Sequence, residues 1–293
     1  MLYLDYISEM KLFIKAIPAL FLIMFLLSCK KEKDEQVSYS DKKGVEYSSE
    51  KDAQIQKYNL DRQKKLAANR SSCDTLSLKE YILNHYPIGT YLLNSDKTLN
   101  YNTPKPAVIY YNQDKRYIFC VIVKSREGER LIEPTNIIGY DQSFIDLDST
   151  ELGTAFFYLT LFRCFNDTFE EIWEAPIPSH GGFNTISYKR WNKQNIPYIE
   201  VNFHYGRGSG HINYNYFLLD DIINKPHLLM TYKGINFKRT ITIVNDDKYP
   251  DYYEYIYYDF GDRVYLKDSV AFVWKRNDNV YVNTRNHKQT RFY

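Results

Sequence analysis

The chain has 293 residues, which is enough for one large domain or two small ones. Hydrophobic residues make up 44% of it and charged residues 25%, so the chain is able to bury a core. The 38 basic residues almost balance the 36 acidic ones, for a formal net charge of +2. Because a nucleic-acid-binding surface needs a basic excess on one face, we expect no nucleic-acid partner.

The start of the chain has the organisation of an export signal. The segment 10–15 is basic, and an apolar stretch over 16–27 follows it. This stretch is short for a membrane span but has the right length for the apolar region of a signal peptide. We therefore predict that residues 1–28 are a signal peptide.

The apolar stretch ends in Leu26-Leu27-Ser28-Cys29. This tetrapeptide resembles the lipobox of bacterial lipoproteins. The resemblance implies that the chain is cut before Cys29 and that this residue carries acyl chains such as palmitate. Lys30 follows directly, whereas a membrane helix that merely contained a cysteine would continue in apolar residues. We expect lipidation of Cys29 to hold the protein to a membrane.

Charged residues follow the lipidation site. The run Lys30-Lys31-Glu32-Lys33-Asp34-Glu35 is similar to the signal that sends some lipoproteins of Bacteroidota to the outer face of the outer membrane. The same residues would also make a plain solvated linker. The resemblance implies a lipid-anchored location at the cell outer membrane, and it leaves the cell surface and the periplasmic face both open.

Residues 29–70 are predicted to be a flexible tether, because they are polar and carry charges of both signs. A short helical run within 52–68 is open as an alternative, although it lacks a convincing apolar face. A β-rich extracytoplasmic domain is expected over 71–293. It should begin with one short helix, capped by Thr75 or Ser77, and this helix should present Leu78, Tyr81 and Ile82 on one face.

From Ala107 onward, short apolar and aromatic runs alternate with turn residues at roughly regular spacing. This pattern predicts an all-β, mainly antiparallel fold, either a sandwich-like or a propeller-like array of sheets. The 29 tyrosines agree with it, since aromatic side chains suit pleated surfaces. The predicted strands are 107–112, 117–124, 155–165, 170–173, 185–191, 198–205, 211–219, 227–232, 239–244, 252–260, 269–275 and 279–283.

Three cysteines remain besides the lipidation site: Cys73, Cys120 and Cys164. The last two lie in apolar strands, where a thiol behaves as a small hydrophobic group. An exported chain permits a disulfide, but three thiols leave one unpaired. We expect buried, unpaired cysteines and leave a disulfide open.

One predicted hairpin has a polar face that is a candidate ligand site. A four-residue loop over 207–210 would set Tyr205 opposite Ile212 and Phe203 opposite Tyr214, which joins two apolar faces. The opposite face would either bind a ligand or simply face solvent. Two imidazoles and a carboxylate on it are also zinc-ligand types. Its side chains are Glu200, Asn202, His204, His211, Asn213 and Asn215.

An Asp-rich turn over 245–254 is a candidate calcium loop. It resembles the turns of FG-GAP or VCBS-type repeats, in which oxygen ligands at alternate positions suit Ca²⁺. The sequence departs from that pattern at Ile243 and Lys248, which replace a carboxylate and a glycine. The alternative is a turn held by its own side chains. The resemblance implies as ligands Asn245, Asp247, Asp251 and Glu254.

The sequence contains neither a Gly-x-Ser-x-Gly elbow nor a His-Glu-x-x-His motif, which disfavours an enzyme. The leading hypothesis is a non-catalytic, lipid-anchored envelope protein that recognises a protein or glycan through an aromatic-rich β surface. The lipobox together with the Asp-rich turn is also similar to periplasmic lipoproteins that inhibit lysozymes. That resemblance implies an inhibitor or immunity protein against a cell-wall hydrolase as an alternative. A hydrolase is the third hypothesis.

Overall fold

The computed structural model describes residues 49–94, 105–111, 116–126, 155–178, 183–205 and 210–290. The chain divides into two compact units, Met1–Tyr47 and Ser48–Tyr293, and the described residues all belong to the second. The predicted signal peptide, Cys29 and the first part of the predicted tether therefore lie outside the described residues. Within the described ranges, none of the helices combines the length and the apolar character that crossing a membrane requires.

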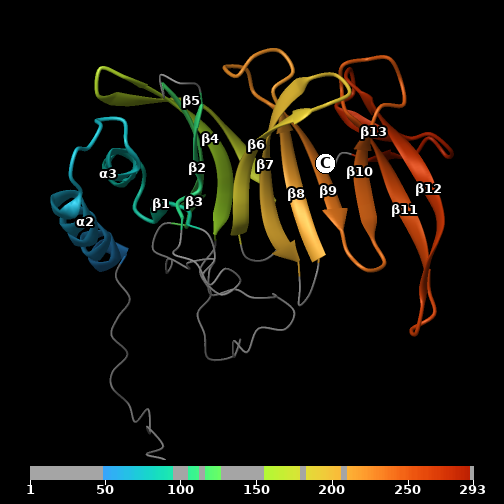
Figure 1. Cartoon of the computed structure of the whole chain (residues 1–293), viewed down its shortest axis with the longest axis horizontal. Coiled ribbons are helices and arrows are strands. Elements are labelled where there is room, and N and C mark those ends of the chain that lie inside the picture. Colours follow the sequence, from blue (N-terminus) through green and yellow to red (C-terminus); the bar gives the residue numbers. More distant parts are fainter. Residues whose placement is uncertain are drawn as a thin grey trace, which may run out of the picture. The chain divides into compact units, whose positions relative to one another are not determined.

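The first sheet has five antiparallel strands. Four of them lie in the order β1-β3-β4-β5, and β2 pairs with the other end of β3 (Figure 1). Buried apolar residues fill most of β3 on both faces, which places this strand at the centre of the packing. The strands are β1 (Thr90–Leu92), β2 (Val108–Tyr111), β3 (Tyr117–Lys124), β4 (Phe156–Phe165) and β5 (Thr168–Ile177).

The second sheet is a nine-stranded antiparallel meander in which each strand pairs with the next along the chain. Its strands are β6 (Phe183–Trp191), β7 (Ile196–Tyr205), β8 (Gly210–Phe217), β9 (His227–Lys233), β10 (Lys238–Thr242), β11 (Asp251–Asp259), β12 (Val264–Lys275), β13 (Val280–Asn283) and β14 (Gln289–Thr290). All twelve predicted strands are present, together with the short β1 and β14. The all-β, mainly antiparallel prediction is confirmed, and the architecture is sandwich-like.

The main core lies between the first sheet and strands β6 to β9 of the second. Phe157 of β4 meets Phe203 of β7 edge to face, with 5.6 Å between the ring centroids. A buried hydroxyl in this core has a backbone partner: Tyr216 donates to the Pro176 carbonyl at 2.7 Å. Four tyrosines of the described residues are fully buried, Tyr214, Tyr216, Tyr252 and Tyr281, and the Tyr281 hydroxyl also donates to a backbone carbonyl, that of Pro250, at 3.0 Å.

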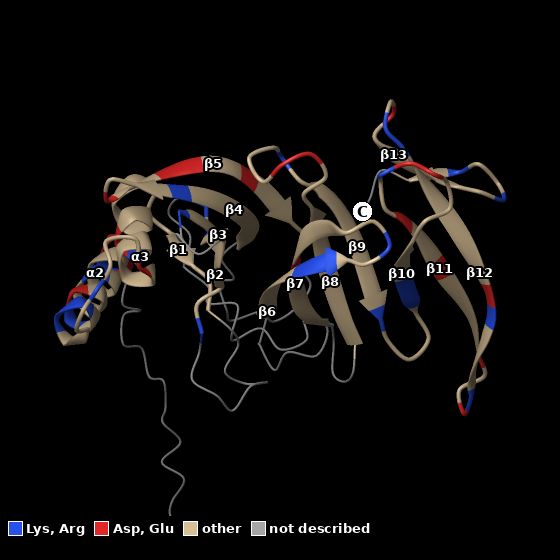
Figure 2. Cartoon of the chain, turned by 45° about the horizontal axis from the view of Figure 1, so that its top comes forward, with Lys and Arg blue, Asp and Glu red and all other residues tan. Residues whose placement is uncertain are grey.

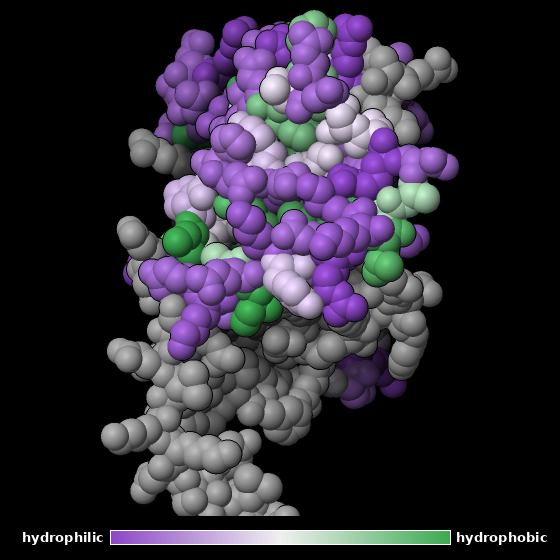
Figure 3. All heavy atoms as spheres, turned by 90° about the vertical axis from the view of Figure 1, so that its left-hand side faces the viewer, coloured by the Kyte–Doolittle hydropathy of each residue, from purple (hydrophilic) through white to green (hydrophobic). Residues whose placement is uncertain are grey.

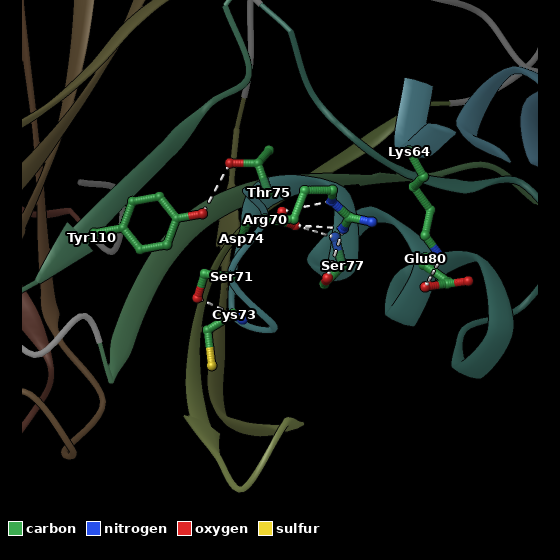
Figure 4. Close-up of polar contacts among 9 residues, drawn as sticks. All are labelled: Lys64, Arg70, Ser71, Cys73, Asp74, Thr75, Ser77, Glu80 and Tyr110. Atoms are coloured by element: carbon green, nitrogen blue, oxygen red, sulfur yellow. Dashed lines mark hydrogen bonds and ion pairs between the residues drawn. The ribbon is translucent and has the colours of Figure 1, made fainter. Parts of the chain in front are cut away.

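The predicted short helix is α3 (Thr75–His85), and it covers the other face of the first sheet. Leu78 and Ile82 are fully buried against this sheet, which confirms the predicted apolar face. The cap differs from the prediction. The Asp74 carboxylate accepts from the Ser77 amide at 2.8 Å, so Asp74 caps the helix, and neither Thr75 nor Ser77 does (Figure 4).

A second helix, α2 (Ser49–Leu66), occupies a segment that was predicted to belong to the tether. Leu60 is 5% exposed, and Lys64 donates to Glu80 of α3 at 2.6 Å (Figure 4). The sequence lacks a wide apolar stripe here because one buried leucine and one ion pair attach the helix. Such sparse contacts leave almost no periodic signal.

Cys73 and Cys164 form a disulfide that joins the segment before α3 to the end of β4. The expectation of unpaired cysteines was wrong for this pair, because the fold brings together two residues 91 positions apart in the sequence. It holds for Cys120, whose free thiol is buried in the core under α3. Burial also raises the pKa of this thiol, so it is not a reactive group.

Candidate functional site

The β7–β8 hairpin keeps the predicted faces but not the predicted pairs. Phe203 lies opposite Ile212 and Tyr205 lies opposite Gly210, so the pairing is displaced by two residues from the prediction. A displacement of two leaves every side chain on its original face. The apolar set therefore enters the main core as expected, and the polar set lies on the opposite face.

The amides of this polar face bind one another and the neighbouring strands. Asn184 of β6 donates to the Oδ1 atom of Asn202 at 2.8 Å, and Asn202 donates to Asn213 of β8. Asn215 is 1% exposed and donates to Leu229 O and Thr231 Oγ1 of β9, both at 2.9 Å. These side chains therefore tie four strands together rather than facing a free ligand surface.

The charged and imidazole groups of the same face do not gather into a metal site. His204 and His211 are directly opposite, with ring centroids 5.0 Å apart, and not diagonal as predicted. Glu200 lies four residues from His204 and pairs with Lys189 at 2.6 Å. Across the described ranges, no three histidine, cysteine or acidic side chains come close enough to hold a metal ion.

The Asp-rich turn is held by its own hydrogen bonds. The buried Asp251 carboxylate accepts from the amides of Val244 at 2.8 Å and Trp274 at 3.0 Å. Asp247 accepts from the Tyr249 amide at 2.8 Å and from the Asn245 side chain at 2.8 Å. Burial raises the pKa of Asp251, and the hydrogen bonds from these amides oppose that rise.

Glu254 lies away from the other candidate calcium ligands. Successive residues of a strand point to opposite faces, so Glu254 and Asp251 lie on opposite faces of β11. Glu254 accepts instead from the Tyr232 hydroxyl at 3.0 Å and from Arg239 at 3.2 Å. The four predicted ligands do not converge, and the geometry matches the alternative of a self-held turn.

The end of the β11–β12 hairpin, residues 256–268, is the part of the described surface with the clearest binding character. We call it the aromatic arm. Strand β10 pairs with β11 only as far as Tyr255, and β13 pairs with β12 only from Phe272 onward. Within the described ranges, the arm is therefore a two-stranded ribbon that no third strand flanks. Figures 1 and 2 show it extending past the β9–β10 turn.

Large apolar side chains on the arm are open to solvent. Phe260 at the tip is 67% exposed, and its ring lies 5.9 Å from Tyr258 and 6.2 Å from Tyr265. Ile256 and Leu266 are 41% and 57% exposed. Tyr258, Phe260 and Tyr265 form one exposed aromatic group, whereas Leu266 pairs with Tyr257 and therefore lies on the other face of the ribbon. An exposed apolar group is a candidate interaction site.

The turn and the base of the arm fix its position. Gly261 has φ +85°, and its amide donates to Asp259 Oδ1 at 2.9 Å, which closes the turn that presents Phe260. At the base, Arg285 binds both carboxylate oxygens of Asp268 and the Ser269 carbonyl. The Arg285 guanidinium lowers the pKa of Asp268 to about 2, so this brace is charged at neutral pH.

Sequence reasoning did not single out the arm, although the sequence carries a signal for it. Tyr255-Ile256-Tyr257-Tyr258 is apolar at every position, whereas a strand with one solvent-exposed face alternates. Such a continuous run in a strand that no described strand flanks on its outer side leaves large side chains exposed, as it does here. Sequence alone cannot tell an exposed apolar strand from a buried one, because that requires knowing which strands other parts of the fold cover.

No protein family, curated protein or solved structure matches this chain. The fold and the arm define its class: an all-β, sandwich-like protein with two helices on one side among its described residues and a projecting aromatic hairpin.

Proposed function

We propose that the protein is a lipid-anchored, non-catalytic binding protein of the bacterial cell envelope and that the aromatic arm is its binding surface. One observation carries the proposal: three aromatic side chains, Tyr258, Phe260 and Tyr265, between 48% and 67% exposed, cluster at the end of a ribbon that no third described strand flanks. Beyond its own strand pairing, the arm is bonded to the β9–β10 turn, where Asn236 donates to Asp259 at 3.0 Å, and this contact leaves the aromatic rings open to a partner.

The chemistry of the arm favours a protein as the partner. Tyrosine and phenylalanine supply most of the affinity in the centre of protein interfaces, and charged residues belong to the rim. Acidic and basic residues both lie at the tip, as Figure 2 illustrates by colour. The outer backbone edges of the ribbon, which no described strand pairs with, also offer hydrogen bonds to an extended segment of a partner.

Two further features support an extracytoplasmic location. The lipobox-like segment ending in Cys29 implies an anchor, and residues 30–48 that follow it separate the anchor from α2. The Cys73–Cys164 disulfide is a bond that forms and persists in oxidising compartments outside the cytoplasm.

A photo-crosslinking experiment in intact cells tests the proposal. A benzophenone side chain replaces Phe260 in one variant and Phe165 in the control variant. Phe165 is 57% exposed at the end of β4, where it offers an aromatic ring without the neighbouring cluster. We expect an adduct with an envelope protein from position 260 and none from position 165. Adducts with glycan alone, or equal yields from the two positions, would overturn the protein-binding assignment.

A further inference from the structure

A small pocket lies between α2, α3 and β1, and none of its lining residues belongs to the aromatic arm. Its volume is about 210 Å³. Because a water molecule occupies roughly 30 Å³ of liquid volume, the pocket has room for a ligand of several heavy atoms. Figure 3 views the molecule from the side of the helices, where hydrophilic side chains dominate and smaller hydrophobic areas appear between them.

The pocket has an apolar floor and a rim of amides. Leu60 of α2 and Leu92 of β1 are 5% and 4% exposed and form the floor together with Leu83 of α3. Side-chain amides come from α2 and from the end of β1. Each amide offers both donors and an acceptor, which is the pairing that a sugar hydroxyl needs. The amide-bearing residues are Gln56, Asn59, Gln63 and Asn94.

Lys79 is the one charged residue among those that line the pocket. Across the two helices, Lys64 of α2 pairs with Glu80 of α3. Lys79 has no ion-pair or hydrogen-bond partner within the described ranges, and burial alone lowers its pKa below the ordinary value. A half-buried ammonium without a carboxylate beside it would gain from a bound anion.

The walls of the pocket are held in place. The Lys64–Glu80 ion pair joins α2 to α3, and Arg70 binds the capping carboxylate of Asp74 at 2.8 Å (Figure 4). The chain between the helices is therefore fixed at both ends. Pre-formed walls reduce the ordering cost that a small ligand must overcome.

We propose that this pocket binds a small polyol that carries a carboxylate, such as a uronic acid. The carboxylate pairs with the Lys79 ammonium, the hydroxyls exchange hydrogen bonds with the rim amides, and the apolar face of the sugar ring lies on the leucine floor. A neutral sugar would leave the ammonium without a counter-charge. A bare anion such as acetate would leave the amides and the floor unused.

Isothermal titration of the purified full chain with glucuronate, glucose and acetate tests this assignment. Charge-assisted hydrogen bonds are among the strong ones, so glucuronate should bind at least ten-fold more tightly than glucose or acetate. Lys79→Gln should remove this preference, and Lys79→Arg should restore most of it. Lys65→Gln is the matched control, because Lys65 is an exposed lysine of α2 outside the pocket, and it should change nothing.

Three results would overturn the inference: no binding of glucuronate to the natural chain, equal affinities for glucuronate and glucose, or unchanged affinity in Lys79→Gln. Equal affinities for acetate and glucuronate would overturn the polyol part. The Lys79→Arg variant keeps the positive charge at the same position. If it binds glucuronate and Lys79→Gln does not, the loss in Lys79→Gln comes from the missing charge and not from a general intolerance of substitution at this position.

Discussion

At the scale of single residues, His227 shows how burial fixes a protonation state. The Tyr281 hydroxyl donates its proton to the Pro250 carbonyl at 3.0 Å, so it accepts from His227 Nε2 at 2.8 Å. The ring also lies 4.5 Å from Trp274, inside an aromatic cluster. Burial lowers the pKa of His227 to about 4, and the ring is therefore neutral in the folded protein.

This depressed pKa predicts acid sensitivity in a defined window. Between pH 6.5 and pH 4 the unfolded chain binds a proton at His227 that the folded chain does not, so the free energy of unfolding falls as pH falls. The loss should reach roughly 3 kcal/mol by pH 4. Urea unfolding at pH 7 and pH 4 measures it. His227→Gln keeps a donor for Tyr281 but cannot titrate, and it should flatten this pH dependence.

The matched control for this prediction is His85→Gln. His85 is an exposed residue at the end of α3, and its replacement should leave the pH dependence as it is. If the His227→Gln variant loses as much stability on acidification as the natural chain, His227 is not the group responsible.

At the scale of the element, the aromatic arm should separate binding from stability. Phe260→Ala removes the most exposed ring of the cluster, so we expect the free energy of unfolding to change by less than about 0.5 kcal/mol. Binding to the crosslinked partner should weaken by roughly 2 kcal/mol, about thirty-fold, as at interface hot spots. Biolayer interferometry with the identified partner and thermal unfolding measure the two quantities. Phe165→Ala should change neither the binding nor the stability. If Phe165→Ala weakened binding as much as Phe260→Ala does, the role of the arm would be contradicted.

The elements that sequence predicts well are those whose pattern is local. Strands such as β3 show long apolar runs between turn residues, and α3 shows Leu78 and Ile82 one turn apart. Helix α2 agrees with the helical run within 52–68 that the sequence left open as the alternative to a tether, and sequence could not favour it because its attachment depends on α3, which lies outside any local pattern. The β7–β8 register escapes because displacement by two keeps the same faces. The polar face of this hairpin was predicted as a candidate ligand site because sequence cannot show that Asn215 is enclosed by β9.

At the scale of the whole molecule, the disulfide closes a covalent ring of chain from Cys73 to Cys164, which contains α3 and most of the first sheet. Cross-linking residues 91 positions apart reduces the entropy of the unfolded chain, worth roughly 4 to 5 kcal/mol in the chain-entropy account. The double variant Cys73→Ala and Cys164→Ala should lose about this much in urea unfolding. Dithiothreitol should destabilise the natural chain to a similar extent and leave the double variant unchanged. If, without reductant, the natural chain and the double variant had equal free energies of unfolding, the Cys73–Cys164 bond would be contradicted.

The anchor is the last property that belongs to the whole molecule. Each acyl methylene buried in a bilayer contributes about 0.8 kcal/mol, so the proposed acyl chains on Cys29 would hold the protein to the membrane through washing with salt. Cys29→Ala should move the protein from the membrane fraction to the soluble fraction and remove palmitate labelling. Ser28→Ala keeps a small residue before the cleavage point and should remain anchored and labelled. Full membrane retention of the Cys29→Ala variant would show that another part of the chain binds the bilayer, and the aromatic arm, with Phe260 at its tip, would then be the first segment to test against vesicles.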